Sequence, residues 1–452
     1  MRATDPRAVR RLGMAVLAGS ALMASPVRGQ DLASDEQEHA PGSSESSERA
    51  VSVSLATALR LRVESWSNFG FDPDQDDTYL LGRILFGTDL RLGDHFRVYV
   101  QARSSLSTER DLPGGRRSID ADDLGLQNAF LDVILPLGED SRLTARAGRQ
   151  EMLLGKQRLV SPLYWANTQR TFDGARAILN TKGLEVQGYW ARLVRVRKSE
   201  FNKSDAGMDF FGVYATHASA SGSPGLDVYW LALVRDSAAF NGTSGKENRH
   251  TLGVRIGGAT KSARLEYDVE GSFQFGTLGE ERISAFMLGS VLTYKFGPAP
   301  ALPWLLAGFD VGSGDSSEGG AVGTFNQLFP LGHAYLGYAD VVGRQNVISP
   351  SVGVGMEPIK GLVIALRGYH FWRARVGDAL YNAGGAVVRA PGESDSRTVG
   401  NELDVTTTYR FARYFLGQVG YSRFFAGSFI EDTGPSDDIS FLYASLTARF
   451  PD

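Results

Sequence analysis

Apolar and polar side chains alternate along most of this chain, and this period of two constrains the fold more than any other feature. Between Ala263 and Gly276, for example, Ala, Leu, Tyr, Val and Phe side chains alternate with Arg, Glu, Asp, Ser and Gln. Successive side chains of a β-strand point to opposite faces, so each such segment has one apolar and one polar face. The chain is therefore predicted to be all-β.

The lengths of the segments and of their connections narrow the fold further. Several segments run to about 11 residues or more, the length of a tilted strand that crosses a membrane. Long connections such as 65–79, 151–172 and 314–345 alternate with short ones such as Thr181-Lys182 and Ala412-Arg413. This alternation is typical of an outer-membrane barrel with short periplasmic turns and long extracellular loops.

The prediction is a transmembrane antiparallel β-barrel of about 18 strands over residues 51–452. An even number of strands leaves both chain ends in the periplasm. The strands are expected near 51–64, 80–92, 95–107, 125–135, 142–150, 173–180, 183–194, 209–220, 224–235, 249–258, 263–276, 283–297, 303–313, 346–357, 361–374, 401–411, 414–426 and 438–450.

The first 50 residues differ from the rest and indicate export. Arginines precede the apolar run Leu12–Ala24, which is followed by small residues and by Val27-Arg28-Gly29. This order predicts a signal peptide over residues 1–29, because the apolar run is too short to span a membrane as a helix. Residues 30–50 have few large apolar side chains and are expected to form a disordered periplasmic lead. The predicted location is the outer membrane of a Gram-negative bacterium.

The last strand and the composition limit the partners and the chemistry. Residues 438–450 end in Phe450 and resemble the signal that the barrel assembly machinery recognises, although Pro451-Asp452 follows the Phe. The absence of cysteine excludes disulfides, thiolate metal sites and cysteine nucleophiles. The run Asp72–Asp77 has the oxygen ligands that Ca²⁺ prefers, but such a run is more often a solvated loop.

The inward faces of the strands are expected to carry the function, because a barrel of this size can hold an aqueous channel. Of the 47 basic residues only 8 are Lys, and the planar guanidinium of Arg suits carboxylates and phosphates. The alternatives are that these arginines pair with carboxylates of the lumen, or that the Arg usage reflects base composition. The arginines predicted to face inward are Arg83, Arg91, Arg97, Arg103, Arg142, Arg146, Arg255 and Arg367.

Two segments are more specific than composition. They are GRQEMLLGKQRLVSPLYWANTQRTFDGAR at Gly148–Arg176 and FNQLFPLGHAYLGYADVVGRQN at Phe325–Asn346. Together they resemble the alginate export family, whose best-known member is an eighteen-stranded outer-membrane porin with an Arg-rich lumen. The candidate solute contacts in these segments are Arg149, Gln150, Arg158, Arg170, Asp173, Arg176, Asn326 and Arg344. These side chains either surround the channel mouth or form a constriction; the alternative is that the two segments only pack against each other.

The resemblance implies a passive channel for an anionic polysaccharide or oligosaccharide such as a polyuronate, with no catalytic residues, cofactor or metal. The alternative functions are a general or small-anion porin, a porin that prefers cations, a plugged structural barrel, and a barrel enzyme. Removal of residues 1–29 lowers the net charge from −4 to −8, which favours the cation-preferring alternative.

The expected partners are an acidic polysaccharide or other anionic solute, outer-membrane lipid and the barrel assembly machinery. A periplasmic secretion partner is a further possibility, and nucleic acid is not expected. The resemblance implies a monomer. The alginate exporter has a longer periplasmic turn before its seventeenth strand than Ala412-Arg413, so gating by that turn is not expected here.

Overall fold

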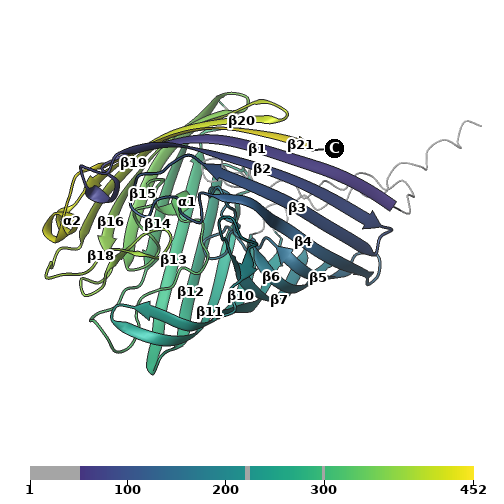
Figure 1. Cartoon of the computed structure of the whole chain (residues 1–452), viewed down its shortest axis with the longest axis horizontal. Helices are drawn as coiled ribbons and strands as arrows, with labels where there is room; N and C mark the ends of the chain where they lie inside the picture. The colour runs from purple at the N-terminus through teal and green to yellow at the C-terminus, as the bar shows by residue number, and fades with distance from the viewer. Residues whose placement is uncertain (1–50, 219–223, 298–300, 452) are drawn as a thin grey trace, which may run out of the picture.

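The computed structural model describes residues 51–218, 224–297 and 301–451. It confirms the predicted fold, a closed antiparallel barrel of eighteen strands (Figure 1). The predicted signal peptide and periplasmic lead lie outside the described residues. No helix of the described segments is long and apolar enough to cross a membrane.

The wall strands follow one another in chain order. They are β1 (Val51–Ser67), β2 (Asp77–Leu92), β3 (Phe96–Ser107), β4 (Asp122–Pro136), β5 (Arg142–Gln150), β6 (Phe172–Thr181), β7 (Leu184–Arg195), β9 (Met208–His217), β10 (Gly225–Phe240), β11 (Thr243–Ala259), β12 (Leu265–Leu278), β13 (Glu281–Lys295), β14 (Trp304–Gly312), β15 (Val347–Ile359), β16 (Leu362–Arg373), β19 (Thr398–Ala412), β20 (Phe415–Ala426) and β21 (Ile439–Pro451). Short elements of the connections are η1 (Phe69–Phe71), β8 (Lys203–Ser204), α1 (His333–Leu336), β17 (Leu380–Tyr381), β18 (Val387–Arg389) and α2 (Ser428–Thr433).

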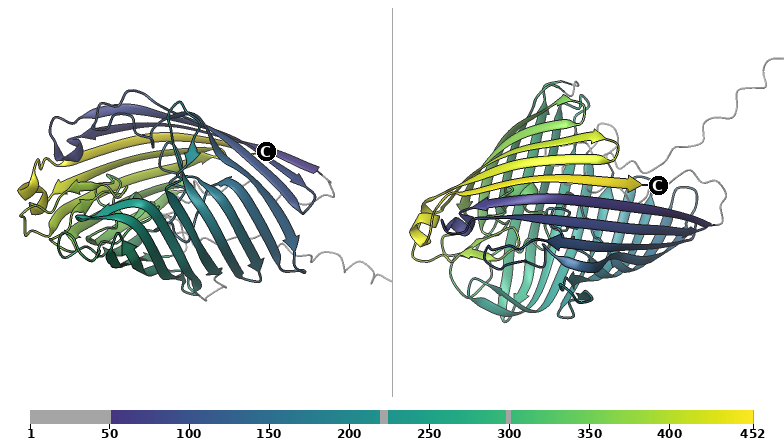
Figure 2. Two further views of the ribbon diagram at one scale, coloured as in Figure 1. Left: turned by 60° about the horizontal axis from the view of Figure 1, so that its bottom comes forward. Right: turned by 45° about the horizontal axis from the view of Figure 1, so that its top comes forward.

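The barrel closes between its first and last strands. Strand β21 pairs with β1 from Ala56↔Pro451 to Ser67↔Ser440, and Figure 2 shows these two strands side by side. The last strand ends on the side of the short turns, as expected for an even number of strands (Figure 1).

The period of two separates the two faces of the wall. In β1, Leu61 is 58% exposed on the outside, whereas Arg60, Arg62 and Glu64 are each 3% exposed on the inside. An outer-membrane barrel presents its exposed apolar face to lipid and its polar face to the lumen. The apolar residues of the alternation therefore form the lipid-facing belt.

A charged substitution in this belt is expected to destabilise the barrel far more than an apolar one. Val254 is an outward, 43% exposed residue in the middle of β11. Replacing it with arginine is expected to lower the free energy of unfolding by about 2–4 kcal/mol, because a charge near the bilayer midplane loses its hydration. Urea unfolding in lipid vesicles measures this value, with Val254→Leu as the control. Equal stabilities of the two variants would contradict a lipid-facing position.

Two extracellular connections are shorter than the sequence suggested. Strands β10 and β11 run on past the expected limits of 235 and 249 and meet at Asn241-Gly242, where both residues have positive φ. The turn between β12 and β13 is likewise only two residues long. The extended ends are stabilised by a small core in which Phe240, Leu278 and Val322 are buried.

Candidate functional site

Two long extracellular connections, 151–171 and 313–346, fold into the barrel, and we call them together the plug. Helix α1 belongs to the second connection and lies within the ring of strands (Figure 1). The two segments pair with each other at Val160 and Phe329. The Phe329 amide donates to the carbonyl of Leu159 at 2.8 Å, and the Ser161 amide donates to the carbonyl of Phe329 at 2.9 Å. The plug is therefore one hydrogen-bonded unit.

One side of the lumen is basic. Among the described residues, strands β1–β3 bury five arginines but only two carboxylates, so most of these cations need partners from elsewhere. The plug supplies backbone carbonyls: Arg62 donates to the carbonyl of Trp165 at 2.6 Å, and Arg83 to that of Ala166 at 2.9 Å. We call these arginines the basic wall; they are Arg60, Arg62, Arg83, Arg97 and Arg103.

The other side of the lumen is acidic. Strands β10–β19, as far as they are described, bury nine carboxylates and two arginines, Arg249 and Arg373. Here the plug directs its own cations towards the wall: Arg158 pairs with Asp268 and Glu270, and Arg344 Nη2 lies 2.9 Å from Asp310. The carboxylates of this acidic wall are Asp227, Glu247, Glu266, Asp268, Glu270, Asp310, Glu357, Glu402 and Asp404.

Backbone amides of the plug complete the contact with the acidic wall. The Ala339 amide donates to Glu402 at 2.9 Å, and the Tyr338 amide donates to Asp404 at 3.3 Å. The plug thus presents carbonyls to the basic wall, and guanidinium and amide groups to the acidic wall. Since buried charges are costly unless they are paired and hydrogen-bonded, this complementarity fixes the orientation of the plug.

Arg170 joins the two plug segments. Its Nη1 donates to the carbonyls of Ser161 at 3.0 Å, Pro330 at 3.4 Å and Phe329. Burial lowers the pKa of Arg170 to about 10, so the guanidinium remains charged at neutral pH. Charge-assisted hydrogen bonds of this kind are stronger than neutral ones. Arg170 therefore acts within the plug, between the two segments singled out in the sequence.

A row of arginines crosses strands β3–β6 on the inward face. Arg97 is opposite Asp132, which is opposite Arg146, which is opposite Arg176. Asp132 accepts from Arg146 at 2.7 Å and lies 3.8 Å from Arg97. Arg176 donates to Gln187, with no ion pair to a carboxylate among the described residues. Like charges directly opposite each other destabilise a sheet, and here Asp132 offsets the charge of Arg146, whereas Arg176 is bound by the side-chain amide of Gln187.

The structure gives the remaining predicted site residues the following places. Arg367 faces inward and donates to Ser351 at 2.8 Å and to the carbonyl of Ala334 at 3.2 Å. Gln150 is buried at the end of β5, and Asn326 is buried in the plug, where its amide donates to Gln274 at 2.8 Å. Arg103 contacts the plug at the carbonyl of Gln169 and also pairs with Asp122. Arg142 is exposed at the periplasmic end of β5.

Arg149 and Asp173 do not face the lumen, contrary to the expectation for them. They form a 2.7 Å ion pair on the outward side of β5 and β6. Arg146 faces inward, and because successive residues of a strand face opposite sides, Arg149, three positions further on, faces outward. Segment 196–204 covers them from outside: the carbonyl of Asn202 accepts from Arg149 at 3.0 Å. Arg60 and Arg62 also face the lumen, which was not predicted from the sequence, although their alternation with Leu59 and Leu61 indicates this position.

The family model for alginate export matches residues 51–441, from the first wall strand into the last. The chain belongs to the alginate export family. No curated protein sequence matches it. The resemblance inferred from the two plug segments is thereby confirmed.

Solved structures similar to this alginate export family barrel are outer-membrane porins. Pseudomonas aeruginosa OccK11 is 15% identical, with a TM-score of 0.56 and coverage of 88% of this chain and 96% of that one. Acinetobacter baumannii OccAB1 is also 15% identical, with a TM-score of 0.58 and coverage of 88% and 96%. Pseudomonas aeruginosa OccK2 in complex with glucuronate is 12% identical, with a TM-score of 0.57 and coverage of 88% and 98%. The chain is thus an outer-membrane channel protein, in the location predicted from its sequence.

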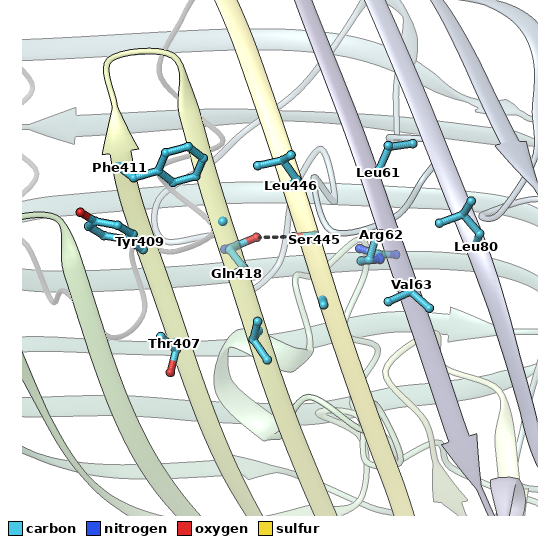
Figure 3. Close-up of a pocket in the computed structure, with 13 residues that line it drawn as sticks. Leu61, Arg62, Val63, Leu80, Thr407, Tyr409, Phe411, Gln418, Ser445 and Leu446 are labelled. Carbon is cyan, nitrogen blue, oxygen red and sulfur yellow. Dashed lines mark hydrogen bonds between the residues drawn. The ribbon is translucent and has the colours of Figure 1, made fainter.

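The outside of this family member carries a groove across β1 and β19–β21 (Figure 3). Small residues at Gly417 and Ala444 form its floor, and exposed apolar side chains such as Leu61, Phe411 and Leu446 form its sides. These exposed apolar side chains belong to the lipid-facing belt, so the groove lies on the outside of the wall.

The geometry of Asp72–Asp77 does not support the hypothesis that this run binds Ca²⁺. Asp72 accepts from the Asp74 amide at 3.0 Å, and Asp76 accepts from the Asn68 amide at 2.8 Å. In the described part of the chain, no group of three or more His, Cys, Asp or Glu side chains is placed to hold a metal ion. These aspartates stabilise the turn between β1 and β2.

Proposed function

We propose that this outer-membrane channel passes anionic saccharides, either an alginate-like polyuronate or its oligosaccharides, through a lumen with fixed positive charge. The observation that carries the proposal is the pair Arg146 and Arg176, which lie directly opposite each other on the inward face. A carboxylate moving past this pair meets the Arg176 guanidinium beside Arg146, which Asp132 already pairs with, and the planar fork of Arg suits carboxylate oxygens.

The basic wall and the plug support an anion path on the same side of the barrel. Arg97 is on the basic wall in β3, two strands away from Arg146 in β5, and both contact Asp132 of β4. Local field rather than net charge governs permeation, so the acidic overall composition does not oppose the proposal. OccK2, a barrel of similar fold, has been crystallised with the uronate glucuronate. A uronate is the repeating chemistry of the proposed solute.

A second candidate is a porin for small anions without a polymer substrate. It is favoured by the plug, which the two walls hold across the lumen by ion pairs and hydrogen bonds. In either case we expect a monomer with no catalytic residues or cofactor, inserted by the barrel assembly machinery. Delivery by a periplasmic partner would apply to the polymer alone.

Arg176→Gln tests the proposed selectivity. Removing this guanidinium is expected to shift the reversal potential in a planar bilayer under a KCl gradient towards cations, since no carboxylate of the described segments pairs with Arg176 and would be released. The matched control is Arg149→Gln, on the neighbouring strand but facing outward, which should leave the reversal potential unchanged. Equal shifts in the two variants, or none, would contradict the proposed anion path.

A further inference from the structure

The connection between β7 and β9 carries a surface that the channel function does not use. Residues 195–203 lie at the extracellular end of β4–β6, where Phe201 covers the outward-facing Arg149. Asn202 anchors them: its Nδ2 donates to Asp122 at 2.7 Å, and its carbonyl accepts from Arg149 at 3.0 Å. Asn202 itself is only 2% exposed. The segment is therefore held against the outward face at the extracellular end of β4–β6.

The anchored segment exposes an aromatic side chain beside cations. Phe201 is 66% exposed and lies over the outward-facing guanidinium of Arg149, at 5.7 Å from the ring centroid. Trp190, further along the same outward face, is 47% exposed and donates to Asp209 at 2.9 Å. Exposed aromatic residues at this height of a barrel are typical of the membrane–water interface.

The cations of the segment have weak partners or none. Within the described residues, neither Lys198 nor Lys203 forms an ion pair with a carboxylate, and both are exposed. Arg197 pairs with Glu200 at 3.0 Å, but both side chains are more than half exposed, so this pair is easily exchanged. Arg195 is 65% exposed and pairs with Asp205. The segment that carries Phe201 thus has two exposed ammonium groups without a carboxylate partner among the described residues, and two exposed guanidinium groups in surface ion pairs.

We propose that segment 195–203 docks a phosphate-bearing glycolipid of the outer leaflet, with Phe201 among the acyl chains and Lys198 and Lys203 on the phosphates. Position favours a lipid over a soluble polyanion, because Phe201 covers Arg149, whose side chain lies on the lipid-facing side of β5. Charge favours a phosphorylated headgroup, since basic side chains near a membrane surface each attract anionic lipid. The aromatic residue adds apolar burial to the electrostatic contact.

Native mass spectrometry of the full chain in detergent, titrated with a diphosphorylated glycolipid, tests this proposal. Lys198→Gln combined with Lys203→Gln is expected to weaken binding by about tenfold or more. The matched control replaces Lys182 and Lys261, two exposed lysines of periplasmic turns, with glutamine and should bind like the unmodified chain. A dephosphorylated glycolipid should bind the unmodified chain more weakly than the phosphorylated one.

Phe201→Ser gives an independent readout, because it leaves every charge in place and should still lower the affinity. The proposal would be overturned if both lysine pairs behaved alike, or if the glycolipid lost its phosphates without losing affinity. Displacement of the glycolipid by polyuronate would also overturn it, in favour of a polysaccharide dock. An unchanged reversal potential in the Lys198/Lys203 variant separates this site from the proposed channel function.

Discussion

Replacing Arg158 with methionine is expected to release the plug from the acidic wall and to raise the single-channel conductance several-fold. Arg158 is fully buried, and its guanidinium pairs with both Asp268 and Glu270. Removing one partner of a buried ion pair costs about 3–5 kcal/mol, because the remaining charge loses its compensation. In the variant, Asp268 still accepts a hydrogen bond from Arg255, and Glu270 still accepts one from Tyr229. We therefore expect a loss near the lower end of this range. Planar-bilayer recording measures the effect.

The control for Arg158→Met is an ion pair outside the lumen. Arg423 pairs with Asp438 at 3.1 Å, and both side chains are about one-third exposed. Such a pair contributes about 0–1 kcal/mol, so Arg423→Met should leave the conductance unchanged. An unchanged conductance in Arg158→Met would show that the plug does not depend on the acidic wall for its position.

Replacing Arg170 with methionine is expected to uncouple the two plug segments from each other. Arg170 is the donor to the carbonyls of Ser161, Phe329 and Pro330, and hydrogen bonds from a charged donor contribute about 1.5–3 kcal/mol each. The amides of Ser161 and Phe329, which join the segments, should then exchange with solvent about a hundredfold faster. Hydrogen exchange detected by mass spectrometry reports both amides.

Arg170→Lys distinguishes charge from geometry in this prediction. The ammonium keeps the charge but not the planar fork, so protection of the two amides should fall to an intermediate value. Amides at the periplasmic end of the β19–β20 pair, where Tyr409 is opposite Gly417, serve as the internal reference, since the plug amides contact β19 at Glu402 and Asp404. Full protection of the Ser161 and Phe329 amides in Arg170→Met would contradict the role of this side chain as a link.

The wall of the barrel could be predicted from the sequence because its determinants are local. Alternation specifies each strand and its two faces, and this information lies within about ten neighbouring residues. The misjudged ends of β10 and β11 show the limit of local reasoning. The end of β10 packs through Phe240 in a cluster with Val322, from a connection more than 70 residues away in the chain.

The site could be predicted only in part, for the same reason. The alternation of faces along each strand places Arg83, Arg97 and Arg176 inward. The same alternation along β5 places Arg149 outward. The plug could not be predicted this way, because its contacts join distant segments: Arg62 reaches Trp165, and Arg344 reaches the carbonyl of Arg158, 186 residues away. A single sequence does not reveal which buried arginines hold a loop and which face solute.

Single-channel recordings with polyuronate oligomers of increasing length, and with neutral oligosaccharides of the same lengths, test whether this channel selects acidic saccharides. We expect polyuronate alone to block the current, with residence times that grow with oligomer length and shorten in Arg176→Gln. Blocks of equal duration by neutral and acidic oligomers, or no block by polyuronate, would contradict an acidic-saccharide channel and leave a barrel of the alginate export family with a different solute.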